Sequence, residues 1–319
     1  MGRVLYNGLH WNNPPSLDPT YGAQPQYKAG QQFSSAFVVA LGDISYTDPS
    51  GNVYSTSYNG WQDIVKYINT STSRTSEVVI RLYWPQGNAM NGNPGQTLGQ
   101  QFYSKIVKPV VVLGVHNFQV LNELNLEYSK YNNDPGGLAG DMYNIAYWIK
   151  HQAQIDGIGN VYLGFPGPGG DIGNPSNSGW ASYWNNFAAI IKQTTDQGNA
   201  YNWLGVHTYE FSGNGLQTRM TAQYDDLVNR FINYPHRYTE YSIPVSQFGG
   251  NYQNRANDLK TAIKNFKTHV ETKNPSGPDV YSLFYYIAFS SGGDDTTYNL
   301  VVDNNTTDLG PAQTLASAF

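Results

Sequence analysis

Eight short apolar segments alternate with amphipathic segments along most of this 319-residue chain. Each apolar segment has the length of a strand buried in a sheet, and most of the segments between them have the periodicity of a helix. The predicted strands are 3–11, 37–44, 78–84, 117–121, 161–165, 203–209, 237–241 and 280–288. The predicted helices are 60–69, 97–107, 138–154, 180–193, 216–232 and 256–272. This alternation predicts an α/β fold with a parallel sheet.

Two architectures satisfy the alternation, an open doubly wound sheet and a closed (β/α)8 TIM barrel. A dinucleotide-binding open sheet would carry a Gly-rich turn after its first strand, and none follows residues 3–11. The length suits a barrel of ~250 residues with long loops. Segments rich in Gly, Asn and Pro follow the predicted strands, where a barrel has its active-site loops. We therefore expect residues 1–319 to form a single (β/α)8 barrel domain.

The charge and composition exclude several classes of partner. Charged residues make up 13% of the chain and the net charge is −5, which argues against binding to nucleic acid or to an anionic membrane surface. No apolar run approaches the ~18 residues of a membrane-spanning helix. No cysteine is present, so disulfides and thiolate metal sites are excluded. The 26 Tyr and 7 Trp residues suit a carbohydrate partner, because sugar faces stack on aromatic rings.

No secretory signal is visible at the start of the chain. We nevertheless expect a secreted or extracellular protein, with a cytoplasmic location as the alternative. The oligomeric state is not predicted.

Polar and aromatic side chains gather at the predicted carboxyl ends of the strands, which meet at one mouth in a barrel. The chain has six Glu residues, and three of them, Glu123, Glu210 and Glu240, fall at strand ends. The other candidates at these ends are His10, Trp11, Arg81, Trp84, Asn122, His207, Tyr209 and Tyr285.

Two carboxyl groups at one barrel mouth are the requirement for glycoside hydrolysis. Glu123 follows the fourth predicted strand and Glu240 ends the seventh. One carboxyl group must be protonated to donate to the leaving oxygen, and the other must be ionised to attack the anomeric carbon. Arg81 and Tyr209 are available to keep the second one ionised. Glu210 is the rival of Glu240, although a solvated loop position is the favoured interpretation for it.

The sequence around these residues resembles the clan A glycoside hydrolases, in which strands four and seven carry the two catalytic glutamates. Asn122-Glu123 is similar to the clan's Asn-Glu on strand four, and Thr239-Glu240-Tyr241 to its strand-seven stretch. His207-Thr208-Tyr209 is similar to its His-x-Tyr on strand six. The resemblance covers the whole chain in layout and is specific at these three places. The family within the clan is not assigned, and the arrangement is loosely similar to glycoside hydrolase family 39.

The resemblance implies a retaining mechanism on a β-linked polysaccharide or oligosaccharide, with carboxyl groups ~5–5.5 Å apart. Glu123 would be the general acid/base and Glu240 the nucleophile. Asn122 would bind the sugar 2-hydroxyl group, and Tyr209 would donate a hydrogen bond to Glu240. The remaining predicted substrate-binding residues are His207, Arg81, His10, Trp11, Trp84 and Tyr285.

The sequence also departs from the clan pattern. Leu124 stands where proline is usual after Asn-Glu, and Ser242 stands where glycine is common. The eighth strand lacks the Trp that commonly forms the floor of the sugar site, so Tyr285, Tyr286 or Phe289 would have to replace it.

Two other functions are compatible with a barrel of this composition. A non-catalytic carbohydrate-binding barrel would keep an aromatic mouth without needing two matched glutamates. A metal-dependent hydrolase would need clustered His ligands at strand ends, which the sequence lacks. No cofactor and no metal are expected, since Asp43, Asp48 and Asn52 do not have the spacing of an EF-hand calcium loop.

Overall fold

The computed structural model describes residues 3–11, 32–62, 65, 77–273, 278–286, 298–300 and 309–319. The chain divides into two compact units. Unit 1 comprises Met1–Val38, Tyr67–Glu77 and Val206–Phe319, and unit 2 comprises Val39–Lys66 and Val78–Gly205. Two of the boundaries fall inside strands β2 (Ser35–Ala40) and β10 (Trp203–Tyr209), so the two units share these strands. The single domain expected from the sequence stays a prediction.

The strands that the structure describes include eight that form one closed sheet, in the order β1-β12-β11-β10-β7-β6-β5-β2. The strand pairs of the closed sheet that lie within each unit are parallel. The fold is therefore the predicted (β/α)8 barrel. Counted along the chain, β6 is the fourth barrel strand and β11 is the seventh. Besides β2 and β10, the strands of the closed sheet are β1 (Val4–Trp11), β5 (Val78–Leu82), β6 (Asn117–Val120), β7 (Tyr162–Phe165), β11 (His236–Ser242) and β12 (Val280–Tyr285).

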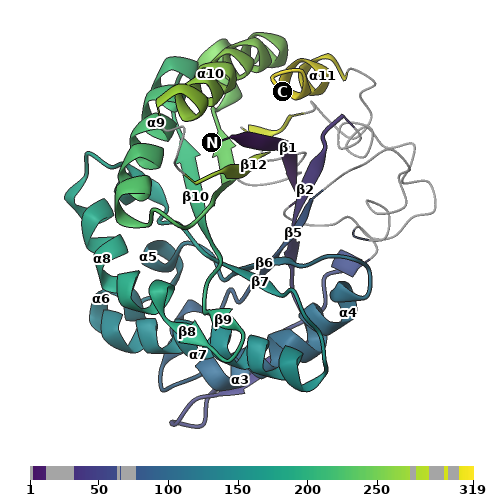
Figure 1. The fold of residues 1–319 in the computed structure, drawn as a ribbon, viewed down its shortest axis with the longest axis vertical. Helices are drawn as coiled ribbons and strands as arrows, with labels where there is room; N and C mark the ends of the chain where they lie inside the picture. The colour runs from purple at the N-terminus through teal and green to yellow at the C-terminus, as the bar shows by residue number, and fades with distance from the viewer. Residues whose placement is uncertain are drawn as a thin grey trace. The chain divides into compact units, whose positions relative to one another are not determined.

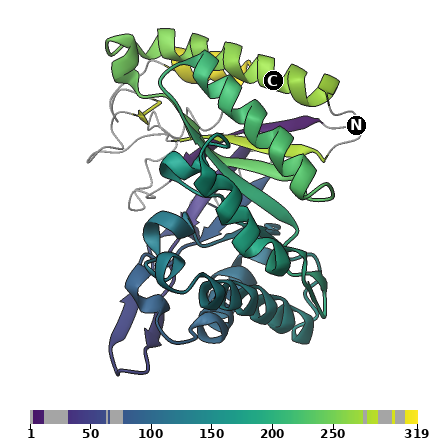
Figure 2. The ribbon, with the colours of Figure 1, turned by 90° about the vertical axis from the view of Figure 1, so that its left-hand side faces the viewer.

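Unit 1 places helices against the strands β10, β11, β12 and β1. Helix α9 (Gly213–Arg230) begins where the Ser212 hydroxyl group accepts a hydrogen bond from the Gly215 N–H. Helix α10 (Tyr252–Lys273) packs against both α9 and α11 (Gly310–Ala316). Figure 1 shows α10 between these two helices, and Figure 2 shows α9 and α10 side by side. The short helix η5 (Val245–Phe248) precedes α10.

In unit 2, the long helix α7 (Pro135–Ile155) packs against α3 (Gly95–Phe102) and α8 (Ser178–Lys192). Helix α7 begins at Asp134, whose carboxylate accepts from the Gly137 N–H. Helix α3 packs closely on α7, since a Cβ built at Gly99 would fall 2.8 Å from the Ile145 carbonyl oxygen. The other elements are η2 (Gly87–Met90), η3 (Tyr103–Val107), α4 (Lys108–Val111), α5 (Leu124–Glu127), α6 (Lys130–Asn133), η4 (Gly170–Gly173), β8 (Thr194–Thr195) and β9 (Gly198–Asn199).

The prediction of one strand over 37–44 is wrong. Strand β2 ends at Ala40, because the Asn59 side chain accepts from the Leu41 N–H at 3.1 Å and donates to the Val39 carbonyl at 3.0 Å. The chain then enters a hairpin of β3 (Ile44–Thr47) and β4 (Val53–Thr56), which are antiparallel.

The turn of this hairpin uses Asp48. Its Oδ1 accepts from the Ser50 and Asn52 N–H groups at 2.9 Å each, and its Oδ2 accepts from the Asn52 side chain at 2.9 Å. These hydrogen bonds, led by the one from the Asn52 side chain, lower the pKa of Asp48. Asp48 and Asn52, two of the three residues weighed as calcium ligands, thus serve the turn, and Asp43 accepts from the Tyr58 N–H at 2.9 Å.

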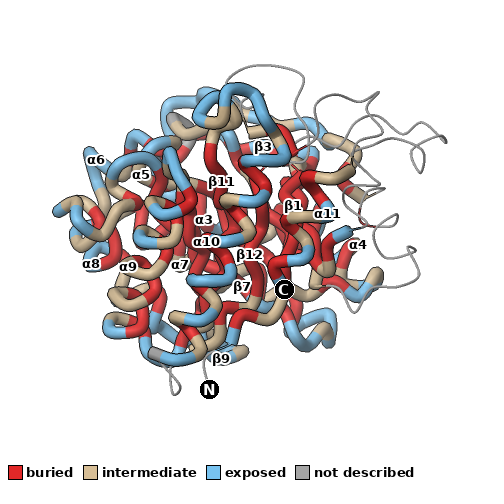
Figure 3. The backbone as a smooth tube through the Cα atoms, turned by 90° about the horizontal axis from the view of Figure 1, so that it is seen from above, coloured by how far each residue is buried: buried red, intermediate tan, exposed pale blue. Residues whose placement is uncertain are grey.

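Two other predicted elements, the eighth strand and the helix 60–69, extend into residues that the structure does not describe. Strand β12 ends at Tyr285, three residues before the predicted end of the eighth strand at 288, and Phe289 lies outside the described residues. Most of the predicted helix 60–69 also lies outside them. Figure 3 shows that the described strands are largely buried while many connecting segments are exposed.

A buried ion pair joins neighbouring strands of unit 1. Arg237 on β11 donates to Glu77 through Nε, at 3.2 Å, and through Nη2. Ser282 on β12 donates to the other oxygen of Glu77 at 2.7 Å. The side chains of Arg237 and Glu77 are only 5% and 10% exposed. Both charges are thus largely withdrawn from water, and each depends on the other.

Replacing Glu77 by Ala leaves the Arg237 guanidinium group buried without its carboxylate. We expect the free energy of unfolding to fall by about 3–5 kcal/mol in chemical denaturation. The double variant Glu77→Leu/Arg237→Met should lose less than the sum of the two single changes. The exposed pair Arg3–Asp279, at 3.6 Å, is the control, and Arg3→Ala should cost less than about 1 kcal/mol. A loss below 1 kcal/mol for Glu77→Ala would contradict this account.

His236 at the start of β11 predicts an acid-sensitive contribution to stability. It is buried, and burial lowers its pKa to about 3. Between pH ~6.5 and 3 the unfolded chain binds a proton that the folded chain excludes. The free energy of unfolding should therefore fall with decreasing pH in this window, by up to ~1.4 kcal/mol per pH unit from this group. The variant His236→Phe should show a shallower slope in urea denaturation at a series of pH values, and an unchanged slope would refute the assignment.

Candidate functional site

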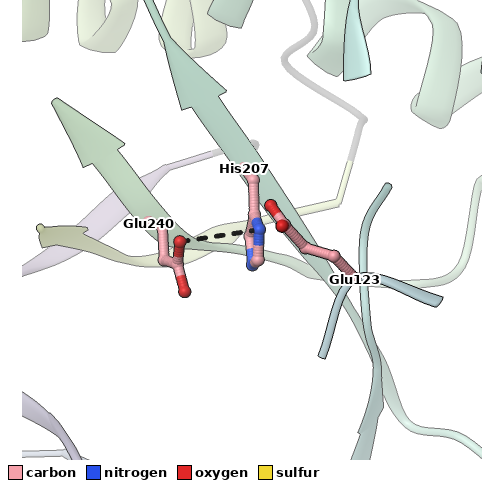
Figure 4. A group of neighbouring side chains, drawn as sticks. All are labelled: Glu123, His207 and Glu240. Carbon is pink, nitrogen blue, oxygen red and sulfur yellow. Dashed lines mark ion pairs between the residues drawn. The ribbon is translucent and has the colours of Figure 1, made fainter. Parts of the chain in front are cut away.

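Glu240 lies on β11 of unit 1 and is only 5% exposed. The Tyr209 hydroxyl group on β10 donates a hydrogen bond to Glu240 Oε2. His207 Nδ1, also on β10, lies 3.7 Å from Oε2, and His10 Nδ1 on β1 lies 3.9 Å from Oε1. Figure 4 marks the His207–Glu240 pair with a dashed line. The buried carboxylate is therefore surrounded by one hydroxyl group and two imidazole rings from neighbouring segments of the sheet.

The alternation of side chains along β10 explains this arrangement. His207 and Tyr209 are two residues apart and so project from the same face of the strand. Thr208 between them projects from the other face, where its hydroxyl group donates to the Gln223 side chain on α9 at 2.5 Å. The His-x-Tyr pattern therefore directs both polar rings to Glu240, and the hydrogen bond expected between Tyr209 and Glu240 is confirmed.

An aromatic cluster continues from His10. The His10 ring packs on Phe37 with ring centroids 4.6 Å apart and on Tyr286 at 5.0 Å. Tyr209 packs on Tyr286 at 5.8 Å and on Tyr298 at 5.4 Å. Tyr286 therefore borders the Glu240 cluster. The sequence offered no signal for Tyr298, because the segment around it has no strand or helix periodicity.

Tyr285 does not lie with Glu240. It is fully buried, its hydroxyl group donates to the Tyr298 carbonyl at 2.8 Å, and its ring faces Tyr241 and the Arg255 guanidinium group. Neighbouring residues of an extended strand project from opposite faces. The structure thus brings Tyr286, and not Tyr285, to the predicted substrate-binding residues of unit 1.

Glu123 belongs to unit 2, where it precedes the short helix α5. Strand β6 ends at Val120, and Leu121 adopts a positive φ of 61°, which is uncommon for a residue with a side chain. The Gln119 side chain donates to the Leu121 carbonyl at 3.0 Å and supports this bend. Glu123 is therefore placed by a turn after the fourth barrel strand and not by the strand itself.

The two polar atoms of the Asn122 side-chain amide differ in their hydrogen bonding. Its Nδ2 donates to Glu127 Oε1, and its buried Oδ1 has no hydrogen-bond partner among the residues that the structure describes. An ionised carboxylate only accepts hydrogen bonds, so the amide nitrogen must face Glu127. The open atom of Asn122 is therefore a buried acceptor, suited to a hydroxyl group of a ligand.

Arg81 and Trp84 lie in a second buried cluster of unit 2. Arg81 on β5 is 2% exposed. Burial raises the pKa of Tyr128 well above its usual value, and the charge of Arg81 opposes that rise. The Tyr128 hydroxyl group donates to the Trp84 carbonyl at 2.6 Å. Trp84 is fully buried and Trp11 of unit 1 is 4% exposed, and their predicted contact with substrate stays a prediction.

Glu210, the rival of Glu240, is held in an ion pair. Arg219 donates to Glu210 Oε1 at 3.2 Å and to the Tyr209 carbonyl at 3.0 Å. The Glu210 side chain is 23% exposed. Its role is therefore to anchor the end of β10 through Arg219, which corrects the interpretation as a residue paired only with solvent.

The sequence matches no protein-family model and no curated protein. Solved structures share its fold. One is the GH5-4 broad specificity endoglucanase from Clostridium acetobutylicum, at 13% identity over 99% of this chain and 97% of that one, with a TM-score of 0.60. Another is the family 5 xyloglucanase from Paenibacillus pabuli, at 14% identity over 98% of both chains, with a TM-score of 0.60. A third is a glucosidase from Croceicoccus marinus, at 13% identity over 99% of this chain and 68% of that one, with a TM-score of 0.62.

At these identities the likeness establishes the barrel fold, which agrees with the resemblance to clan A. The looser similarity to family 39 stays a prediction. Within the described residues, no helix has both the length and the apolar character needed to cross a membrane.

Proposed function

We propose that the protein is a retaining glycoside hydrolase that cleaves β-glycosidic bonds in a polysaccharide or oligosaccharide. The observation that carries the proposal is Glu240, a buried carboxylate on the seventh barrel strand that accepts a hydrogen bond from Tyr209. Glu123 lies in the turn after the fourth strand, close to the second position of the clan A pair. The endoglucanase and the xyloglucanase that share the fold support a carbohydrate substrate.

The proposed reaction has two displacements at the anomeric carbon. Glu240 attacks this carbon while Glu123 donates its proton to the glycosidic oxygen, so that the C–O bond breaks and a glycosyl ester forms on Glu240. Glu123 then takes a proton from water, and the water oxygen displaces Glu240. The mechanism requires carboxyl groups ~5–5.5 Å apart. The hydrogen bond that the Tyr209 hydroxyl group donates to Glu240 stabilises the carboxylate form that Glu240 needs for attack.

The buried Oδ1 atom of Asn122, which has no partner among the described residues, suggests one substrate contact. We propose that Asn122 Oδ1 accepts a hydrogen bond from the sugar 2-hydroxyl group, and that His10 and His207 contact the same sugar. Tyr286 takes the place that the sequence gave to Tyr285. Arg81 is proposed to act on the electrostatics of the site.

The location and domain structure are proposed on the same basis. Polysaccharides are too large to cross a cell membrane unaided, so we propose that the protein is secreted or extracellular. We further propose that residues 1–319 act as one domain, because eight strands from both units are needed to close the sheet.

The first experiment replaces each proposed catalytic residue by its amide. Glu240→Gln should lose the nucleophile and Glu123→Gln the proton donor, and we expect kcat to fall by about 10²–10⁴-fold in each. Initial rates are measured on β-glucan, xylan, mannan and galactan. Glu271→Gln on α10 is the matched control and should retain full activity.

Full activity of either amide variant would overturn the proposal. Wild-type protein that binds one of these glycans but hydrolyses none would favour the non-catalytic carbohydrate-binding barrel. The first product anomer, followed by proton NMR, separates the two hydrolytic mechanisms: β first means retention and α first means inversion.

Tyr209→Phe tests the hydrogen bond to Glu240 alone. The ring and its packing stay, and one charge-assisted hydrogen bond of about 1.5–3 kcal/mol is lost. We therefore expect kcat to fall by about 10- to 150-fold. Tyr238→Phe, on the same strand as Glu240, is the control: its hydroxyl group donates to the Met220 carbonyl at 2.7 Å, and kcat should be unchanged. An unchanged kcat in Tyr209→Phe would remove Tyr209 from the mechanism.

A further inference from the structure

The segment that joins β7 to α8 touches Glu123 through a glycine. A Cβ built on Gly169 would fall 2.0 Å from Glu123 Cδ and 2.1 and 2.4 Å from the two carboxyl oxygens. Gly169 has φ −99°, which any residue adopts, so its backbone conformation does not demand glycine. The backbone of Gly169 therefore lies directly against the carboxyl group, and the contact with Glu123 is what excludes a side chain.

Asn125 holds Gly169 in this place. Its side-chain Nδ2 donates to the Gly169 carbonyl at 3.1 Å, and its Oδ1 accepts from the Gly169 N–H at 2.9 Å. These two bonds engage both polar groups of one backbone residue and fix the plane of the Asn125 amide. Asn125 lies on α5, which begins immediately after Glu123, so one short helix orients the carboxyl group and the side chain that secures its neighbour.

The other end of the same segment is also anchored. The Tyr183 hydroxyl group on α8 donates to the Pro166 carbonyl at 2.8 Å. Burial raises the pKa of Tyr183 well above its usual value, so the hydroxyl group stays a donor. The segment Pro166–Gly170 is thus fixed at both ends within unit 2.

We propose that Asn125 is a positioning residue, which holds Gly169 against Glu123 and so fixes the carboxyl group in the orientation needed for proton transfer. The proposal rests on the proposed function of Glu123 as general acid/base. Backbone atoms on one side of the carboxyl group remove alternative rotamers and exclude water there. A proton donor must stay within hydrogen-bond reach of the leaving oxygen, so rotational freedom lowers the fraction of productive encounters.

The contact itself is tested without substrate, by a double-mutant cycle in thermal unfolding. Gly169→Ala should lower the melting temperature by at least about 3 °C, because its methyl group meets Glu123. In the Glu123→Ala background the same change should lower it far less, because the colliding atoms are gone. Equal losses in both backgrounds would overturn the contact, whatever the activity of the protein.

The role of Asn125 is tested by leaving-group dependence. Asn125→Leu keeps the side-chain shape and removes both hydrogen bonds. We expect kcat/KM on phenyl β-cellobioside, whose leaving group needs a proton, to fall by about 10- to 100-fold. On 2,4-dinitrophenyl β-cellobioside, whose leaving group needs none, kcat/KM should fall by less than about threefold. Asn186→Leu, on the exposed side of α8, should change neither.

Equal losses on both substrates, or no loss on either, would refute the positioning role. The proposed function fails separately, if Glu123→Gln retains full activity on glycans, and the unfolding cycle still decides the contact between Gly169 and Glu123 in that case.

Discussion

A carboxylate withdrawn from water is stable only where hydrogen bonds or opposite charges replace its hydration. Glu240 accepts a hydrogen bond from the Tyr209 hydroxyl group, and the His10 and His207 rings lie 3.9 and 3.7 Å from its carboxyl oxygens. These partners come from β1 and β10, whereas Glu240 comes from β11, so the environment of the carboxylate exists only when the strands pair in the observed order. The same register directs Thr208 away to α9. The chemistry proposed for Glu240 is therefore inseparable from the pairing of the sheet.

Glu123 is supported in a different way. A positive φ at Leu121 ends the strand early, and the side chain is placed by a turn, a short helix and the backbone of Gly169. The nucleophile proposed at Glu240 needs one fixed anionic state, which a strand and a tyrosine hydroxyl group favour. The general acid/base proposed at Glu123 must release and regain a proton, and Glu123 lies at a partly exposed position. The two hydrogen bonds between Asn125 and Gly169 hold the backbone that lies against Glu123.

The sequence predicted the barrel and its strand order because buried strands and amphipathic helices differ in period, and β10 has the predicted bounds. It mispredicted 37–44, since apolar content alone did not reveal that the Asn59 side chain ends β2. It did not separate Tyr285 from Tyr286, because a run of aromatic residues hides which one faces the site. The pairing of Asn125 with Gly169 spans 44 residues and has no local signal.

As the proposed nucleophile, Glu240 should form a covalent bond with the sugar. An activated 2-deoxy-2-fluoro β-cellobioside slows the second displacement and should accumulate the glycosyl ester, which intact-protein mass spectrometry detects as the mass of one fluorinated disaccharide unit. Peptide mapping should then place the label on Glu240. A label on Glu210 or on any other residue would contradict the account. An unlabelled enzyme that hydrolyses the matching β-glucan with inversion would contradict it equally.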